Sequence, residues 1–577
     1  MIGINRAFQP AAPPPQPKTW AGWPAPVAGL LALALYGRTL APGLTWAHNG
    51  ADGGDFLAAA LTGGAPHPPG YPTYQLLLRA AIALFPGEPA RAGNWLSALC
   101  AAMATALLAD LARRSLTGRR WRGFIALVAA LAWAASPMLW GQAVITEVYT
   151  LNALFAVALL WLAWRWRESL DDGRPRRWLI GAGFILGLGL GNHLSLALML
   201  PGLAVWAWSN RRAKTNKNGT RTSADERGRI LSGVSAFIRV HLRSDLKTVA
   251  LALAALALGL SVYAYLPLAA ASQPPVNWGD PRSLSGFWWL VSGRVYGRLV
   301  FGVGLPYLPG RLAAWVAEAL RQFGGPWSAL IALVGLWQID RRDHAWWRLT
   351  GLVALAYSLY AIGYNTADSY VYLIPVWAVA ALWLAEGLAW GFRILRLGPS
   401  MNSGGASGQV SDFGFRNTLH APRSTFYVLR ALLLAALIAL PAISVGRFWG
   451  ESDLHNDHAA QDFVAAALSA AEPDAVILTA TDEPTFALWY ARYGLGLRPD
   501  LTPINVNLYV YPWYQATLAT THPFLVAISG DSDLPTLDRL VAAVAAERPL
   551  YRAEPLNLIF AGFVEKPAGV LVRMTPR

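Results

Sequence analysis

The chain has 577 residues, of which 55% are hydrophobic and only 14% are charged, and its formal net charge is +14. Soluble globular proteins average roughly a quarter charged residues, so this composition excludes an ordinary water-soluble domain. A net positive charge can indicate nucleic-acid binding. Here the Arg and Lys residues cluster in short stretches between apolar runs, where they orient a membrane protein, and we expect no nucleic-acid partner. The single cysteine, Cys100, excludes a disulfide within the chain.

Apolar runs of about 20 residues recur along the chain, as is typical of helices that cross a bilayer. The first run lacks a small-residue cleavage site, so we interpret it as a retained helix. Two short runs around Asn192 are either one bent helix or a hairpin. The sequence predicts an all-α polytopic membrane protein with about eleven spans, at residues 24–42, 93–112, 123–141, 150–164, 178–191, 194–208, 248–268, 326–339, 349–364, 373–390 and 426–445.

The basic residues also predict the orientation of the spans. Most of the 47 Lys and Arg residues lie in alternate connections, and such segments stay in the cytoplasm. We therefore expect a cytoplasmic N-terminal segment at 1–23 and a transmembrane domain at 24–445. Its long outer loops, 43–92 and 269–325, face the opposite side. The inner segments 209–247 and 397–424 are rich in Gly, Ser, Asn and Thr and are typical of flexible linkers.

After residue 446 the composition changes. Residues 475–479 and 524–528 have the pattern of buried strands, and residues 459–471, 484–493 and 534–547 have that of amphipathic helices. This alternation predicts a small extracytoplasmic α/β domain over 446–577.

The first outer loop holds the most informative motif, GADGGDF at residues 50–56 followed by HPPGYP at 67–72. Asp52 and Asp55 precede a helix-like run, so one interpretation is a helix start with Asp52 as N-cap and Asp55 in the first turn. The other is a general base that faces a cavity at the membrane surface. His67, in a proline-rich turn that cannot continue a helix, either binds a phosphate or an acceptor or bonds within the turn.

Further candidates lie in two short outer connections. Glu147 and Tyr149 stand in a segment without basic residues, where Glu147 either favours a helix N-terminus or holds a hydroxyl or a metal. His193 interrupts two apolar runs and is either a satisfied polar residue or a substrate ligand.

The second outer loop supplies another group of candidates. Asn277 and Asp280 lie in an NWGDP segment with an ordinary turn signal. Arg294 and Arg298 are arginines on the outer side, where basic residues are scarce. They either bind a phosphate through the guanidinium fork or extend from an interfacial helix toward water.

Cofactor signals are weak. No Cys pair or His-rich spacing indicates zinc, and no P-loop or dinucleotide fingerprint indicates a nucleotide. The sequence leaves open whether Asp52, Asp55 and Glu147 jointly bind a divalent cation, Mg²⁺ or Mn²⁺, or none. A transferase without a nucleotide site needs a donor delivered in the membrane.

These blocks resemble one family. The GADGGDFLAAA segment with HPPGYP, the TEVYTLN segment at 146–152 and NWGDP at 277–281 are similar, in the same order, to polytopic membrane proteins long filed as a domain of unknown function. The animal members of this family are protein O-mannosyltransferases. The family pattern reads GDSGE, so this chain departs from it with Ala51 before Asp52 and with Asp55 at the usual Glu position.

The resemblance implies a membrane glycosyltransferase of the GT-C architecture, with an acidic catalytic residue in the first outer loop and a polyprenyl-phosphate sugar as donor. It implies that Asp52, with Asp55, is catalytic and that the acceptor hydroxyl attacks with inversion. We expect substrate-binding roles for His67, Tyr71, Glu147, Tyr149, His193, Asn277, Asp280, Arg294 and Arg298. The acceptor is a protein, a glycan or a lipid.

Two other functions are weighed against this one. A transporter or lipid flippase predicts charges in mid-span and internal symmetry, and neither is visible. A non-catalytic sensor or scaffold would not explain the motif that contains Asp52 and His67, except as an element of the fold. The Ala-, Arg- and Trp-rich composition favours a prokaryotic plasma membrane and a role in the cell envelope.

Overall fold

The computed structural model describes residues 22–116, 121–170, 175–219, 246–394, 423–529, 534–555 and 560–577. Nearly all of the predicted N-terminal segment and most of the two predicted linkers lie outside these ranges.

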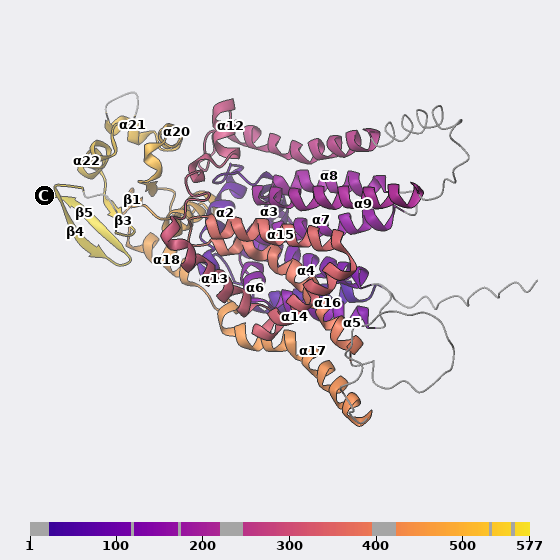
Figure 1. Ribbon diagram of the computed structural model, residues 1–577. Helices are drawn as coiled ribbons and strands as arrows, with labels where there is room; N and C mark the ends of the chain where they lie inside the picture. Colours follow the sequence, from indigo (N-terminus) through magenta and orange to yellow (C-terminus); the bar gives the residue numbers. More distant parts are fainter. Residues whose placement is uncertain are drawn as a thin grey trace, which may run out of the picture.

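A bundle of helices forms the larger part of the molecule (Figure 1). All eleven predicted spans coincide with helical segments. The helices of the bundle are α1 (Pro24–Thr39), α4 (Pro89–Ser115), α5 (Arg122–Ala134), α6 (Pro137–Ala143), α7 (Tyr149–Glu168), α8 (Arg176–Leu190), α9 (Leu200–Gly219), a helix from Leu246 that ends with α11 (Tyr265–Ala270), α14 (Pro326–Arg342), α15 (His344–Gly363), α16 (Ile374–Ile394) and α17 (Arg423–Ser452).

Only some of these helices have the length and apolar composition of a span. Within the described ranges, Pro89–Ser115, Leu246–Ala270 and Ser369–Arg393 do, and α5 with α6 counts as a fourth if the pair is one bent span. The pair bends by 67° because Ser136 is extended and Pro137 starts a new helix. The number of spans therefore stays a prediction.

Helix α4 lies at the centre of the bundle, packed against α1, α5 and α7. Its buried face is rich in small residues, such as Ala98, Ala101 and Ala104. Small side chains allow close helix packing where the surrounding lipid gives no hydrophobic driving force between helices.

The two outer loops carry short helices at one end of the bundle. The first loop holds α2 (Asp52–Thr62) and α3 (Pro72–Leu84), and the second holds α12 (Leu284–Val291) and α13 (Leu308–Arg321). The loops are joined by backbone hydrogen bonds, from Ala65 N to Val276 O at 3.0 Å and from Trp278 N to Ala65 O at 3.1 Å. The second loop is therefore fixed beside the first.

The C-terminal residues form a small domain with a mixed sheet. The strands β1 (Val476–Thr479), β2 (Thr502–Asn505), β3 (Leu550–Arg552), β4 (Phe563–Ala568) and β5 (Leu571–Pro576) lie in the order β2-β1-β3-β5-β4. β1 pairs in parallel with β2 and β3, and β5 is antiparallel to β3 and β4. The helices are α18 (Ala459–Ala470), α19 (Asp482–Trp489) with a following π turn (Tyr490–Gly494), α20 (Pro512–Thr521), α21 (Phe524–Ser529) and α22 (Leu537–Glu547).

The predicted strand at 475–479 and the three predicted helices are confirmed, but the strand predicted at 524–528 is wrong, because this segment is α21. Pro523 suits a first helical turn, and its carbonyl accepts from Ala527 N at 3.2 Å. Only Leu525 of the apolar run is fully buried. A short apolar run cannot be assigned by periodicity alone.

The domain lies at the end of the bundle that carries α2 (Figure 1). Side-chain and backbone contacts attach it there. Tyr490 Oη donates to Glu88, Thr45 Oγ1 donates to Asp457, and Leu454 N donates to Thr39 O at 2.9 Å. The first outer loop thus lies between the bundle and the C-terminal domain.

Candidate active site

Asp52 and Asp55 both lie in the first turn of α2, and one interpretation of the motif predicted this position for Asp55. Negative side chains are favoured there by the helix dipole. The predicted N-cap role of Asp52 is wrong, because the N-cap is Ala51 and no side chain caps this helix. The Asp52 side chain is 32% exposed, whereas that of Asp55 is fully buried. Asp52 is thus the carboxylate that an outside molecule can reach.

His67 lies between the two carboxylates. Its Nδ1 is 2.8 Å from Asp55 Oδ2, and its backbone N–H donates to the same oxygen at 2.8 Å. Its Nε2 faces Asp52 Oδ2 at 3.5 Å. The other oxygen of Asp55 accepts from Trp278 Nε1 at 3.1 Å. Asp55 therefore holds the histidine, and the histidine faces Asp52.

This arrangement sets the charge of the site. Burial alone would lower the pKa of His67, but the charge of Asp52 and the hydrogen bond to Asp55 raise it to about 9. Burial raises the pKa of Asp52 to about 7, against the opposing effect of the His67 charge. At neutral pH the imidazolium therefore lies between two acidic groups, and Asp52 can exchange a proton near physiological pH.

Aromatic rings surround the histidine and continue toward the bundle. The ring of Tyr71 lies 5.0 Å from that of His67 and 6.0 Å from that of His193. His193 is in turn 5.7 Å from Tyr149 and 5.5 Å from Tyr372. Tyr71 has φ 42°, a left-handed conformation that non-glycine residues rarely adopt and that occurs at functional sites. Three predicted residues, Tyr71, Tyr149 and His193, thus form one wall.

His193 has a defined protonation state. Its Nδ1 accepts from Ser195 N at 3.1 Å, which assigns the ring proton to Nε2. Burial and the nearby charge of His67 lower the pKa of His193 to about 4. His193 is therefore a neutral hydrogen-bond donor at physiological pH.

Glu147 precedes Tyr149 by two positions and is buried. Its Oε2 accepts from Val148 N at 3.2 Å, and its Oε1 has no hydrogen-bond partner among the described residues. Burial, followed by the charge of Asp52, raises the pKa of Glu147 well above its usual range. Burial therefore favours the neutral form of Glu147. No group of three His, Cys, Asp or Glu side chains with metal-site geometry occurs within the residues that the structure describes.

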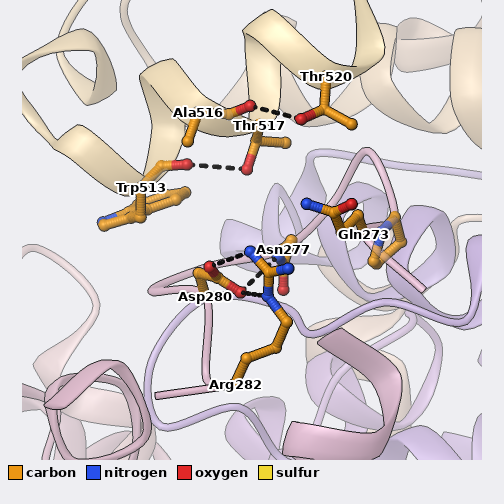
Figure 2. Close-up of a pocket in the computed structure, with 9 residues that line it drawn as sticks. Gln273, Asn277, Asp280, Arg282, Trp513, Ala516, Thr517 and Thr520 are labelled. Carbon is orange, nitrogen blue, oxygen red and sulfur yellow. Dashed lines mark hydrogen bonds and ion pairs between the residues drawn. The ribbon is translucent and has the colours of Figure 1, made fainter. Parts of the chain in front are cut away.

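Asn277 and Asp280 stabilise the loop segment that carries Trp278. Asn277 Nδ2 donates to Asp280 Oδ1 at 3.3 Å, and Arg282 binds both oxygens of Asp280 at 2.7 Å. With Trp513 and Thr517 of α20 they line a surface hollow (Figure 2). The segment they stabilise carries Trp278, which reaches Asp55.

Arg294 and Arg298 are both exposed, and neither forms an ion pair or a side-chain hydrogen bond with another described residue. Tyr296 lies between them in the chain and is half-buried. Burial and then the charge of Asp52 raise the pKa of Tyr296. The loop therefore carries two guanidinium groups that have no partner among the described residues, and its Tyr296 is within reach of the Asp52 charge.

The C-terminal domain also contributes to the site, which the sequence analysis did not predict. The Phe486 ring of α19 is nearly parallel to that of His67, at 9° and 6.2 Å between centroids. A Cβ on Gly54 would lie 2.5 Å from the Phe486 carbonyl oxygen, so only glycine allows this approach. The Gly53–Gly54 pair in the motif was the available signal. Tyr372 and Trp278 were also missed as site residues.

Comparison with known proteins confirms the predicted resemblance. The family model described as Protein O-mannosyl-transferase TMEM260 N-terminal domain matches residues 52–217, and TMEM260-associated domain 2 matches residues 460–522. The first match begins at Asp52, and the second contains α19.

Two curated relatives extend the likeness. Protein O-mannosyl-transferase TMEM260 of Mus musculus is 27% identical over 82% of this chain and 62% of the relative. The tmem260 protein of Dictyostelium discoideum is 20% identical over 84% of this chain and 57% of the relative. The chain thus spans about three fifths of the length of these relatives. Both are eukaryotic proteins and do not support the predicted prokaryotic membrane.

The fold is similar to that of ArnT from Cupriavidus metallidurans, solved bound to undecaprenyl phosphate. The TM-score is 0.53 with 14% identity, over 95% of this chain and 96% of ArnT. The apo state of ArnT gives the same TM-score. At 14% identity this likeness shows the fold alone, a mostly helical bundle with a small C-terminal domain, and the sequence predicted both parts.

Proposed function

We propose that this relative of the TMEM260 protein O-mannosyl-transferases is a GT-C membrane glycosyltransferase, which transfers mannose from a polyprenyl phosphate to a protein hydroxyl. The observation that carries the proposal is the Asp52–His67–Asp55 arrangement, which holds a partly exposed carboxylate with a pKa of about 7. The names of the relatives supply the sugar and the protein acceptor.

In the proposed step, Asp52 accepts the proton of the acceptor hydroxyl. The acceptor oxygen forms a bond to the anomeric carbon while the bond from that carbon to the phosphate oxygen breaks. The bonding electrons leave with the polyprenyl phosphate, and the configuration inverts. A base with a pKa near the working pH suits this proton transfer.

His67 and Asp55 act through Asp52. The imidazolium favours the ionised form of Asp52 and fixes its position, while Asp55 holds the ring through Nδ1 and the turn through the backbone N–H of His67. Asp55 is fully buried and engaged by His67 and Trp278, so we assign it positioning rather than contact with substrate.

The donor phosphate needs cations and neutral donors near its oxygens. Arg294 and Arg298 are free to supply the charge, and His193 presents a neutral N–H from the aromatic wall. ArnT was solved with undecaprenyl phosphate, which supports a lipid-phosphate donor here. Tyr71, Tyr149 and Glu147 would line the sugar pocket.

We further propose that the end of the bundle with the outer loops and the C-terminal domain is extracytoplasmic. This follows from the positive-inside distribution of Lys and Arg, and it is supported by the common position of these parts at one end (Figure 1). In this proposal residues 24–445 form the transmembrane domain, and residues 446–577 form the extracytoplasmic domain.

The test uses the full chain in lipid nanodiscs with polyprenyl-phosphate mannose and a Ser/Thr-containing peptide. Asp52→Asn should reduce transfer by about a hundredfold to ten-thousandfold, because removal of a general base costs roughly 10² to 10⁴ in rate. The control is Asp538→Asn, at an exposed aspartate of α22. Normal transfer by a folded Asp52→Asn protein, or lipid translocation without transfer by the wild type, would reject the proposal.

A further inference from the structure

Helix α19 brings a third carboxylate to the site, from the opposite end of the sequence. It packs on α2 where Gly54 meets Phe486, and Phe486 lies against His67. Asp482 is the first residue of α19, four positions before Phe486. Residues four apart lie on one helix face. Asp482 therefore projects from the face that covers the site, one turn beyond Phe486.

The Asp482 carboxylate is available to a ligand. The side chain is exposed, and it forms no hydrogen bond or ion pair with another residue in the described ranges. The nearby Glu554 is engaged, since it accepts from Ala480 N at 2.7 Å and from Thr481 N at 2.8 Å.

Several charged groups face Asp482 from different elements. His67, Asp55, Asp368 and Glu554 each interact with its charge. Its own charge acts on Asp52, whose pKa it raises. Asp482 is thus electrostatically part of the site that surrounds the proposed base.

The negative charge of Asp482 indicates which of the two substrates, donor or acceptor, this residue would bind. The donor is anionic at its phosphate, and a carboxylate beside that phosphate would repel it. The free cations, Arg294 and Arg298, lie on the second outer loop. Asp482 belongs to the extramembrane domain, from which a water-soluble acceptor would approach, whereas a lipid donor would enter from the bundle.

We propose that Asp482 binds the acceptor, and that its carboxylate accepts hydrogen bonds from backbone N–H groups next to the reacting serine or threonine of a peptide. This inference rests on the proposed glycosyltransferase function. A carboxylate that accepts from a peptide N–H makes a charge-assisted hydrogen bond, stronger than a neutral one.

The experiment compares Asp482→Asn with Glu483→Gln in the full chain in nanodiscs. Glu483 is the adjacent exposed carboxylate. Polyprenyl-phosphate mannose and a synthetic Ser/Thr peptide are varied separately. For Asp482→Asn we expect KM for the peptide to rise about tenfold, the loss of one charge-assisted hydrogen bond. KM for the donor should stay unchanged. The acidic limb of the kcat/KM profile should move to lower pH, because a charge that raises the pKa of Asp52 is removed.

Asp482→Glu, which keeps the charge, should restore the pH limb and part of the peptide KM. A merely structural role would not give that recovery. The inference is overturned if Asp482→Asn matches Glu483→Gln in peptide KM, whether or not the pH limb moves, or if the donor KM rises instead. Failure of the proposed function would appear separately, as absence of transfer by the wild type.

Discussion

Asp55 Oδ2 accepts two hydrogen bonds from His67, one from the backbone N–H and one from Nδ1, each 2.8 Å long. The turn and the ring are thus fixed by one oxygen atom, and Nε2 is left to face Asp52. Because Asp55 is fully buried, this positions the ring without competition from water.

The charge of His67 predicts a shift in the pH profile. It lowers the pKa of Asp52, so His67→Asn should raise that pKa further and move the acidic limb of kcat/KM above the wild-type value of about 7. The acidic limb of the Asp482→Asn variant should instead move to lower pH. His193→Asn should reduce activity without moving the limb, because the pKa of His193 is lowered to about 4 and the ring is neutral. A His67→Asn profile that coincides with the wild type would contradict this assignment.

The contact between Gly54 and Phe486 predicts a steric effect. Gly54→Ala places a Cβ about 2.5 Å from a backbone oxygen, so α19 has to move. We expect a loss of about 1–3 kcal/mol in stability, as for overpacked cores, and a marked loss of transfer.

The matched control is Gly446→Ala in α17, where an added Cβ meets nothing within 4 Å. This change should preserve or slightly raise stability, since Ala is the better helix former. Apparent Tm in nanodiscs measures both variants. Equal Tm values for the two would show that the close approach is not required.

The free arginines predict an effect confined to the donor. The double variant Arg294→Gln and Arg298→Gln should raise KM for polyprenyl-phosphate mannose about tenfold or more, because each guanidinium contributes a charge-assisted bond to phosphate. KM for the peptide should not change. Arg539→Gln, at an exposed arginine of α22, is the control. An unchanged donor KM in the double variant would remove these residues from phosphate binding.

The sequence predicted the parts of the site that depend on local order. Asp52, Asp55 and His67 lie within one short loop, and a rigid proline-rich turn after a helix start brings them together. The helical segments were found because their apolar runs are long, whereas 524–528 was too short for its periodicity to decide between strand and helix.

The remaining residues depend on contacts between distant segments. Trp278 reaches Asp55 across 223 positions, and Phe486 reaches His67 from another domain. Neither distance is encoded in a local pattern. The Tyr372 ring is likewise brought to His193 by the packing of the bundle. Only the glycine pair before Asp55 signalled that some backbone would approach closely.

The contact of Phe486 with His67 also bears on when the protein becomes competent during its biosynthesis. A ribosome that adds roughly 5–20 residues per second needs roughly 20 to 80 seconds between these two positions. Throughout that interval the imidazole ring lacks its contact with Phe486, and the site of the nascent chain is incomplete. Sugar transfer would therefore begin only after nearly the whole polypeptide has been translated and its last domain has folded.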